Sequence, residues 1–183
     1  MELIDIVDEQ GSVTGEVIEK KSAHKLGKWH ITAHVWIYNS KGELMLQRRS
    51  YNKDTFPGLW DISVAGHISA GESPAIGGVR EVEEEIGLSI NEADLEYLFV
   101  QKESHYHPDK DWYNNEFHYV YLCKFDGLIE DLKLQEEEVE ELRFLCPDDL
   151  KLELANKETS KFYVGHPNYY HKIIQEVKSR VDC

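Results

Sequence analysis

Residues 66–88, GHISAGESPAIGGVREVEEEIGL, constrain the fold more than any other stretch of the chain. Ser73 is a suitable N-cap, Pro74 fits a first helical turn, and Gly87 can end a helix in the left-handed conformation. These signals predict a helix over residues 74–86. The apolar side chains that share one side of this helix, and are expected to face the core, are Ala75, Val79, Val82 and Ile86.

The opposite side of the predicted helix is acidic. Glu81, Glu84 and Glu85 stand at i, i+3 and i+4, a spacing that brings three carboxylates close together. Like charges at this spacing cost a few tenths of a kcal/mol per pair, so the cluster needs a compensating partner. Mg²⁺ prefers carboxylate oxygens and completes its shell with water and phosphate oxygens. The helix therefore predicts a divalent metal site that binds a phosphate-bearing ligand.

Glycines in and before the helix fit the same interpretation. Gly77 and Gly78 each cost about 1 kcal/mol relative to alanine inside a helix, which predicts that another group approaches the backbone there. Gly66 and Gly71 bracket a loop in which the backbone carbonyl of Gly66 is a further candidate metal ligand.

The rest of the chain predicts mainly strands around this helix. The whole chain of 183 residues has the length of one domain, over residues 1–183. Alternation of apolar and polar residues predicts a hairpin near the start and a strand near residues 30–37 with His30 and His34 on one face. An amphipathic helix is expected at the end. Further expected strands are 43–48, 95–104 and 116–125, with a loop at 105–115 and the last helix at 168–180.

Charge and hydropathy exclude several functions. A net charge of −15 would repel a polyanion, so a nucleic-acid polymer is not expected as a partner. No apolar run approaches the roughly 20 residues that cross a bilayer, so no membrane partner is expected. The first ten residues, MELIDIVDEQ, lack the basic and apolar parts of a signal sequence, which favours a cytoplasmic protein.

The segment also resembles the Nudix box, GX5EX7REUXEEXGU, at all nine defined positions. The matching residues are Gly66, Glu72, Arg80, Glu81, Val82, Glu84, Glu85, Gly87 and Leu88. The resemblance to Nudix hydrolases implies an α/β/α sandwich with a mixed central sheet, and hydrolysis of a small-molecule diphosphate with Mg²⁺ or Mn²⁺. It implies that Glu81, Glu84 and Glu85 bind metal, that Arg80 orients them, and that Glu72 has a supporting role.

Outside the box the chain is similar to isopentenyl-diphosphate isomerase, a Nudix-fold enzyme. The similar stretches are AHKLGKWHITAHVWIYNSKGELMLQRRS, FPGLWDISVAGH and WYNNEF. This resemblance implies that His24, His30 and His67 hold a second metal and that Glu116 is an acid or base. However, Ala65 replaces the isomerase's proton-transferring cysteine and Asn114 replaces a metal-binding glutamate. Alanine has no proton to transfer, which favours hydrolysis over isomerisation.

Three functions remain open, with hydrolysis preferred over isomerisation and over a non-catalytic module that senses a diphosphate. Glu81, Glu84 and Glu116 are the candidate catalytic residues, and either Glu81 or Glu116 is the general base. Arg48 and Arg49 are candidates for binding substrate phosphate, because a guanidinium can pair with two phosphate oxygens. The family's members are often dimers, so the resemblance allows a homodimer.

Overall fold

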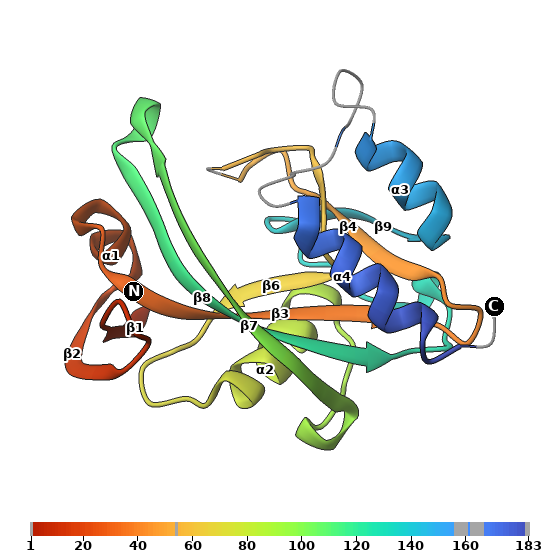
Figure 1. The fold of residues 1–183 in the computed structure, drawn as a ribbon, viewed down its shortest axis with the longest axis horizontal. Helices are drawn as coiled ribbons and strands as arrows, with labels where there is room; N and C mark the ends of the chain where they lie inside the picture. The colour runs from red at the N-terminus through yellow and green to blue at the C-terminus, as the bar shows by residue number, and fades with distance from the viewer. Residues whose placement is uncertain (1, 54, 156–160, 162–166, 182–183) are drawn as a thin grey trace. The chain divides into compact units, whose positions relative to one another are not determined.

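The computed structural model describes residues 2–53, 55–155, 161 and 167–181 (Figure 1). The chain forms two compact units. The first unit comprises Met1–His34, Ala65–Glu81 and Asn91–Tyr121. The second comprises Val35–Val64, Val82–Ile90 and Leu122–Cys183. Strand β3 and helix α2 each run from one unit into the other, so their residues are described with the unit to which they belong.

The first unit is built mainly from strands. Its elements are β1 (Leu3–Val7), β2 (Val13–Glu19), α1 (Lys20–Leu26), the start of β3 (Trp29–Tyr38), most of β6 (Val64–His67), the start of α2 (Pro74–Ile86), β7 (Leu95–His107) and most of β8 (Trp112–Lys124). Short 3-10 turns lie at Glu92–Asp94 and Pro108–Lys110. In this unit β1 lies between β2 and β3, both β6 and β8 pair with β3, and β7 pairs with β8.

Two small apolar clusters hold the first unit together. Ile4 and Ile6 of β1 pack with Ala23 of α1, which fixes the short helix against the hairpin of β1 and β2. Ala33 and Ile68 pack with the start of α2 through Ala75. Removing these side chains from water stabilises the unit by roughly 25 cal/mol for each Å² of apolar area.

The second unit surrounds the end of β3. Its elements are β4 (Leu44–Arg49), β5 (Trp60–Asp61), β9 (Val139–Leu145), α3 (Pro147–Ala155), α4 (Pro167–Lys178), the end of α2, and a 3-10 turn at Ile129–Asp131. Strand β4 pairs with β3, β5 and β9 in antiparallel fashion, with Tyr38 opposite Leu44 and Gln47 opposite Leu142. The sheet is mixed and, with the helices, gives an α/β architecture.

Helix α4 confirms the predicted apolar stripe. Its buried side chains are Tyr169, Tyr170, Ile173, Ile174 and Val177. The indole nitrogen of the fully buried Trp36 donates a hydrogen bond of 2.9 Å to the hydroxyl of Tyr169, so the polar atom of each ring has a partner inside the apolar core. Among the described residues, no helix has the length and hydropathy needed to cross a membrane.

Helix α2 has the predicted boundaries. The hydroxyl of Ser73 accepts a hydrogen bond of 3.3 Å from the backbone of Ile76, and Gly87 ends the helix with a φ of 67°. A Cβ atom on Gly77 would lie 2.5 Å from the Cδ1 atom of Ile68, so the expected close approach is confirmed at that glycine.

One part of the predicted pattern was wrong. Residues 105–115 were expected to form a loop, but β7 continues to His107 and β8 begins at Trp112. The long hairpin that results is visible in Figure 1, and a single 3-10 turn at Pro108–Lys110 forms its tip. The aromatic residues within 105–115 favour strands, and this preference is stronger than the turn tendency of their polar neighbours.

Candidate functional site

Arg80 contacts two of the glutamates of the predicted metal site on and before helix α2. Its guanidinium donates to both carboxylate oxygens of Glu72, at 3.1–3.3 Å, and to Oε1 of Glu81 at 2.7 Å. It also donates to the backbone carbonyl of His67 at 2.9 Å. Burial alone would raise the pKa of Glu72, but the hydrogen bonds from Arg80 lower it below its usual value. Arg80 therefore fixes the side chains on both sides of it, as expected of an orienting residue.

Gly66 lies directly against Glu81. A Cβ atom at this glycine would lie 2.0 Å from Cδ and 2.3 Å from Cγ of Glu81. Real Cβ atoms do not approach other atoms this closely, so only glycine leaves room for the carboxylate in this position. The structure thus gives Gly66 a steric role that the sequence analysis did not consider. Metal binding by its carbonyl stays a prediction.

The other two candidate metal-binding glutamates of α2, Glu84 and Glu85, differ in exposure. Glu84 is exposed, whereas Glu85 is 5% exposed. The side-chain amide of Gln47 on β4 donates a hydrogen bond of 3.1 Å to Oε2 of Glu85. Gln47 is itself buried, and the sequence analysis did not single it out. Its position in an apolar strand, LMLQRR, was the available signal, because a buried amide needs a partner.

The two candidate phosphate-binding arginines are engaged within the second unit. Arg48 contacts the hydroxyl of Tyr51 and donates to Glu141 at 3.4 Å. Arg49 donates to Asp61 at 3.3 Å and to the backbone carbonyl of Thr55 at 3.0–3.1 Å. Their role in binding substrate stays a prediction, since a ligand would have to compete with these contacts.

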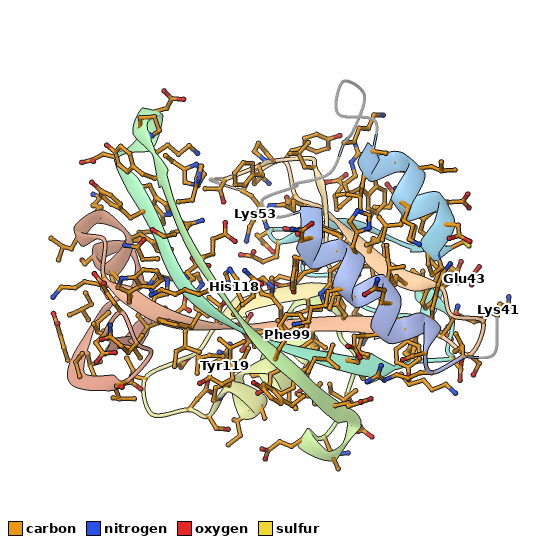
Figure 2. All side chains as sticks on the ribbon, viewed as in Figure 1. Lys41, Glu43, Lys53, Phe99, His118 and Tyr119 are labelled. Atoms are coloured by element: carbon orange, nitrogen blue, oxygen red, sulfur yellow. The ribbon has the colours of Figure 1, made fainter. Side chains whose placement is uncertain are left out.

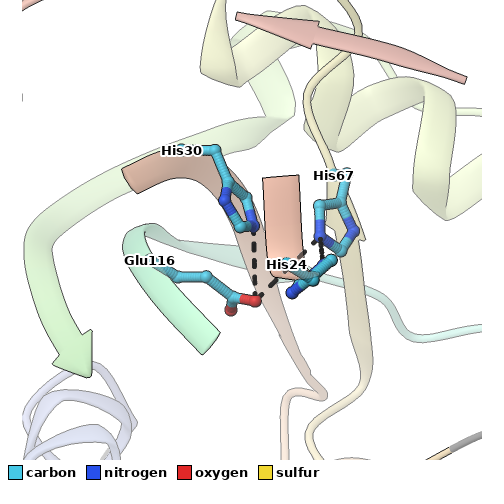
Figure 3. Close-up of side chains that lie close together, drawn as sticks. All are labelled: His24, His30, His67 and Glu116. Atoms are coloured by element: carbon cyan, nitrogen blue, oxygen red, sulfur yellow. Dashed lines mark hydrogen bonds and ion pairs between the residues drawn. The ribbon is translucent and has the colours of Figure 1, made fainter. Parts of the chain in front are cut away.

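A second group of metal-ligating side chains converges in the first unit. One ligand atom from each of His24, His30, His67 and Glu116 lies within 4.8 Å of all the others. Figure 3 shows the three imidazole rings and the carboxylate pointing toward a common centre. Helix α1 supplies His24, strands β3 and β6 supply His30 and His67, and β8 supplies Glu116. The structure thus brings Glu116 beside the three histidines that the isomerase resemblance implies as ligands, and metal binding there stays a prediction.

Backbone carbonyls set the orientation of two rings in this group. Nδ1 of His24 lies 2.8 Å from the carbonyl oxygen of Tyr113, and Nδ1 of His30 lies 3.0 Å from that of Lys28. A carbonyl only accepts, so each Nδ1 donates to it and each Nε2 faces the centre. Metal-binding histidines are commonly held in this way.

The electrostatics of the group also suit a cation. Burial lowers the pKa of His24, and it holds the pKa of His67 well below the usual value, with a further decrease from His30. Burial opposes ionisation of Glu116, but the neighbouring His30 and His118 keep its pKa well below the ordinary range. Neutral imidazoles beside an ionised carboxylate are the protonation states that bind metal.

One buried atom tests whether these residues fit a metal. Nε2 of His30 is buried without a hydrogen-bond partner, and Oε1 of Glu116 lies 3.5 Å away. Nε2 of His24 and Nε2 of His67 are 3.0 Å apart. Ligands of one ion with bonds of about 2.1 Å lie roughly 3.0–3.4 Å from their neighbours, so the spacing of His24 and His67 fits a shared cation and that of His30 and Glu116 is close to it. A cation at the centre would also satisfy the His30 nitrogen.

Comparison with known proteins identifies the family of this chain. A family model described as the NUDIX domain matches residues 28–164. An uncharacterised Nudix hydrolase of Clostridium acetobutylicum is 36% identical over 167 residues, which are 90% of this chain and 79% of that protein. Nudix hydrolase 3 of Arabidopsis thaliana is 33% identical over 98% of this chain, which spans 24% of that protein's length.

Two further similarities concern the isomerase resemblance and the fold. An isopentenyl-diphosphate Delta-isomerase of Streptomyces avermitilis is 29% identical over 88% of this chain and 80% of that protein. The crystal structure of DR0079 from Deinococcus radiodurans has a TM-score of 0.66 and 23% identity, covering 97% of this chain and 98% of that chain. The chain belongs to the Nudix hydrolase family, and its predicted α/β fold with a mixed sheet is confirmed.

Proposed function

We propose that this chain hydrolyses the phosphoanhydride bond of a small-molecule diphosphate, such as a nucleoside diphosphate derivative, with Mg²⁺ or Mn²⁺. The contact between Gly66 and Glu81 supports the proposal most directly. A glycine at that position gives up side-chain packing so that one carboxylate can occupy a defined place, where Arg80 also holds it. Such fixed placement is what catalysis by positioned charges requires.

Three glutamates would bind the divalent ions. Helix α2 is continuous from Pro74 to Ile86, so its period of about 3.6 residues places Glu81, Glu84 and Glu85 on adjoining positions. When bound there, divalent ions neutralise diphosphate charge and lower the pKa of water. Arg80 orients Glu81, and Gln47 holds one oxygen of Glu85.

The general base is either Glu81 or Glu116. Both carboxylates have a cationic or imidazole neighbour that favours the ionised form needed to accept a proton. Replacement of each by Gln separates the two at saturating Mg²⁺, because both carboxylates are also proposed metal ligands and only loss of the base should still lower turnover there. Wild-type turnover of both variants at saturating Mg²⁺ would argue against either as the base.

The direct test of the function uses a substrate panel. Purified protein with Mg²⁺ is incubated with a nucleoside diphosphate sugar, a dinucleotide, a nucleoside triphosphate and isopentenyl diphosphate, and products are identified by mass spectrometry. Cleavage should fall by about 10²-fold in Glu84→Gln and Glu85→Gln, by analogy with loss of transition-state charge stabilisation. Glu83→Gln is the matched control, since Glu83 is an exposed residue on the same helix.

Three outcomes would contradict the proposal. Equal turnover in wild type, Glu84→Gln and Glu85→Gln would show that these carboxylates do not act on the diphosphate. Tight binding of one compound without cleavage would indicate a sensing module. Loss of activity in Glu83→Gln equal to that in the other variants would indicate a general effect of helix charge.

Isomerisation of isopentenyl diphosphate is the second candidate, favoured by the cluster of His24, His30, His67 and Glu116 and by the Streptomyces relative. Ala65 opposes it, because one of the two acid or base groups is missing. A product of unchanged mass from isopentenyl diphosphate would establish this activity and exclude hydrolysis of that compound.

We also propose that the cluster of three histidines and Glu116, called the histidine site below, binds a second divalent ion. Imidazole ligands suit transition ions such as Zn²⁺ better than Mg²⁺, and Co²⁺ is a spectroscopic probe for such a site. Titration of metal-free protein with Co²⁺ should show a site that His30→Ala removes and that excess Mg²⁺ does not fill. Identical titrations of wild type and His30→Ala would contradict this assignment.

A further inference from the structure

A buried histidine outside the ligand set lies on the far side of Glu116. His118 follows Glu116 by two residues on β8, so the two side chains share one face of the strand. Figure 2 labels His118 on this strand. It is 4% exposed, and its Nδ1 lies 3.5 Å from Oε2 of Glu116. His118 has no role in the proposed hydrolytic mechanism.

The two oxygens of Glu116 face different groups. Oε1 lies 3.5 Å from Nε2 of His30 and 4.0 Å from Nε2 of His67. Oε2 faces His118 instead. The carboxylate is therefore held between imidazoles on opposite sides, with one oxygen directed into the histidine site and the other directed out of it.

Three groups fix His118 in turn. The hydroxyl of Thr32 lies 2.7 Å from Nδ1, and a carboxylate oxygen of Glu103 lies 3.2 Å from Nε2. The ring of His34 stacks on it with centroids 4.0 Å apart and an angle of 18° between the planes. Thr32 and His34 alternate with apolar residues on β3, so two paired strands and β7 confine the ring.

We propose that His118 is a positioning residue that directs a single oxygen of Glu116 into the histidine site, and that Glu103 and Thr32 hold His118 in this orientation. The inference rests on metal binding at the histidine site. It adds a second layer of residues that determines how tightly and in what geometry the site holds its ion. Loss of outer partners of this kind typically weakens metal affinity by about 10–100-fold.

The test measures the binding of Co²⁺ alone to the metal-free protein, by calorimetry and by visible absorption. His118→Ala should raise the Kd by about 10–100-fold and alter the Co²⁺ absorption bands, because Glu116 is then free to turn. His118→Asn, which can return a donor near the Nδ1 position, should recover part of the affinity. His171→Ala is the control, since His171 is an exposed histidine on α4.

Glu103→Gln keeps the size of the side chain and the donor-facing oxygen while removing the charge, so it tests the inference even if His118→Ala does not fold. It should raise the Kd several-fold and shift the absorption bands in the same direction. A wild-type Kd and spectrum in both Glu103→Gln and the folded His118 variants would overturn the positioning role alone. Absence of Co²⁺ binding by the wild type would overturn the histidine site as well, and hydrolysis of diphosphate is scored separately.

Discussion

Replacement of Gly66 by alanine offers the sharpest test of the arrangement around Glu81. The added Cβ would lie 2.0 Å from Cδ of Glu81, whereas ordinary contacts begin at 3.4 Å, so the carboxylate must move by about 1.4 Å. The φ of Gly66 lies outside the left-handed region, so alanine brings no backbone strain. The substitution therefore acts first on the side chain of Glu81, whose atoms lie nearest to the added Cβ.

The expected cost falls on activity much more than on stability. A misplacement of about 1 Å can cost roughly 10²-fold in rate, so kcat for the cleaved diphosphate should fall by about that factor. The displaced atoms belong to the outer part of a flexible side chain, whose contact with Arg80 is the main loss. A partly exposed pair of this kind contributes about 0.2–1 kcal/mol, so the free energy of unfolding should decrease by at most about 1 kcal/mol.

A double-mutant cycle supplies the control. With Glu81→Ala already in place, the space beside residue 66 is vacant, and Gly66→Ala should have no further effect on kcat or on urea unfolding. The reasoning would be refuted by a Gly66→Ala variant with wild-type kcat. It would equally be refuted by a second, undiminished loss when Gly66→Ala is added to Glu81→Ala.

Three further outcomes are expected. Gln47→Leu removes a donor from the buried Glu85 carboxylate, so urea unfolding should show a loss of about 1–3 kcal/mol and Mg²⁺ activation should require higher concentrations; unchanged values in both assays would contradict the contact. Tyr169→Phe deprives the Trp36 indole of its acceptor and should lower the free energy of unfolding by about 1–3 kcal/mol. Burial and then His118 hold the pKa of His34 well below that of the unfolded chain, about 6.5, so the unfolded state binds more protons below that pH. Stability should therefore fall as pH drops below about 6.5, and His34→Gln should flatten this dependence in urea titrations.

Local signals explain the parts of the fold that the sequence predicted well. The N-cap at Ser73 and the left-handed Gly87 bound helix α2 within the chain itself, so no distant contact is needed to place its ends. Helix α1 was missed, although Gly27 ends it with a φ of 64°. Its seven residues are too few for a clear apolar period, and packing of Ala23 against β1 stabilises it.

In the candidate site, too, the residues predicted from local sequence differ from those whose partners lie far along the chain. The spacing within α2 predicted its acidic face, and the family resemblance brought His24 together with Glu116. Neither pattern indicated Gln47 or His118, because their partners, Glu85 at 38 residues and Glu103 at 15 residues, depend on strand pairing. Register between strands is set by the whole packed sheet, which a short window of sequence does not contain.

In the hairpin of β7 and β8, the contacts of the histidine site lie on strand β8, away from the tip. Strand β8 delivers both the Tyr113 carbonyl that orients His24 and the carboxylate of Glu116, while the tip at Pro108–Lys110 contributes to neither contact. Insertions or deletions confined to the tip would leave the ligating atoms in register. Evolution, or a designer grafting new loops, can therefore diversify this end of the protein without rebuilding its histidine site.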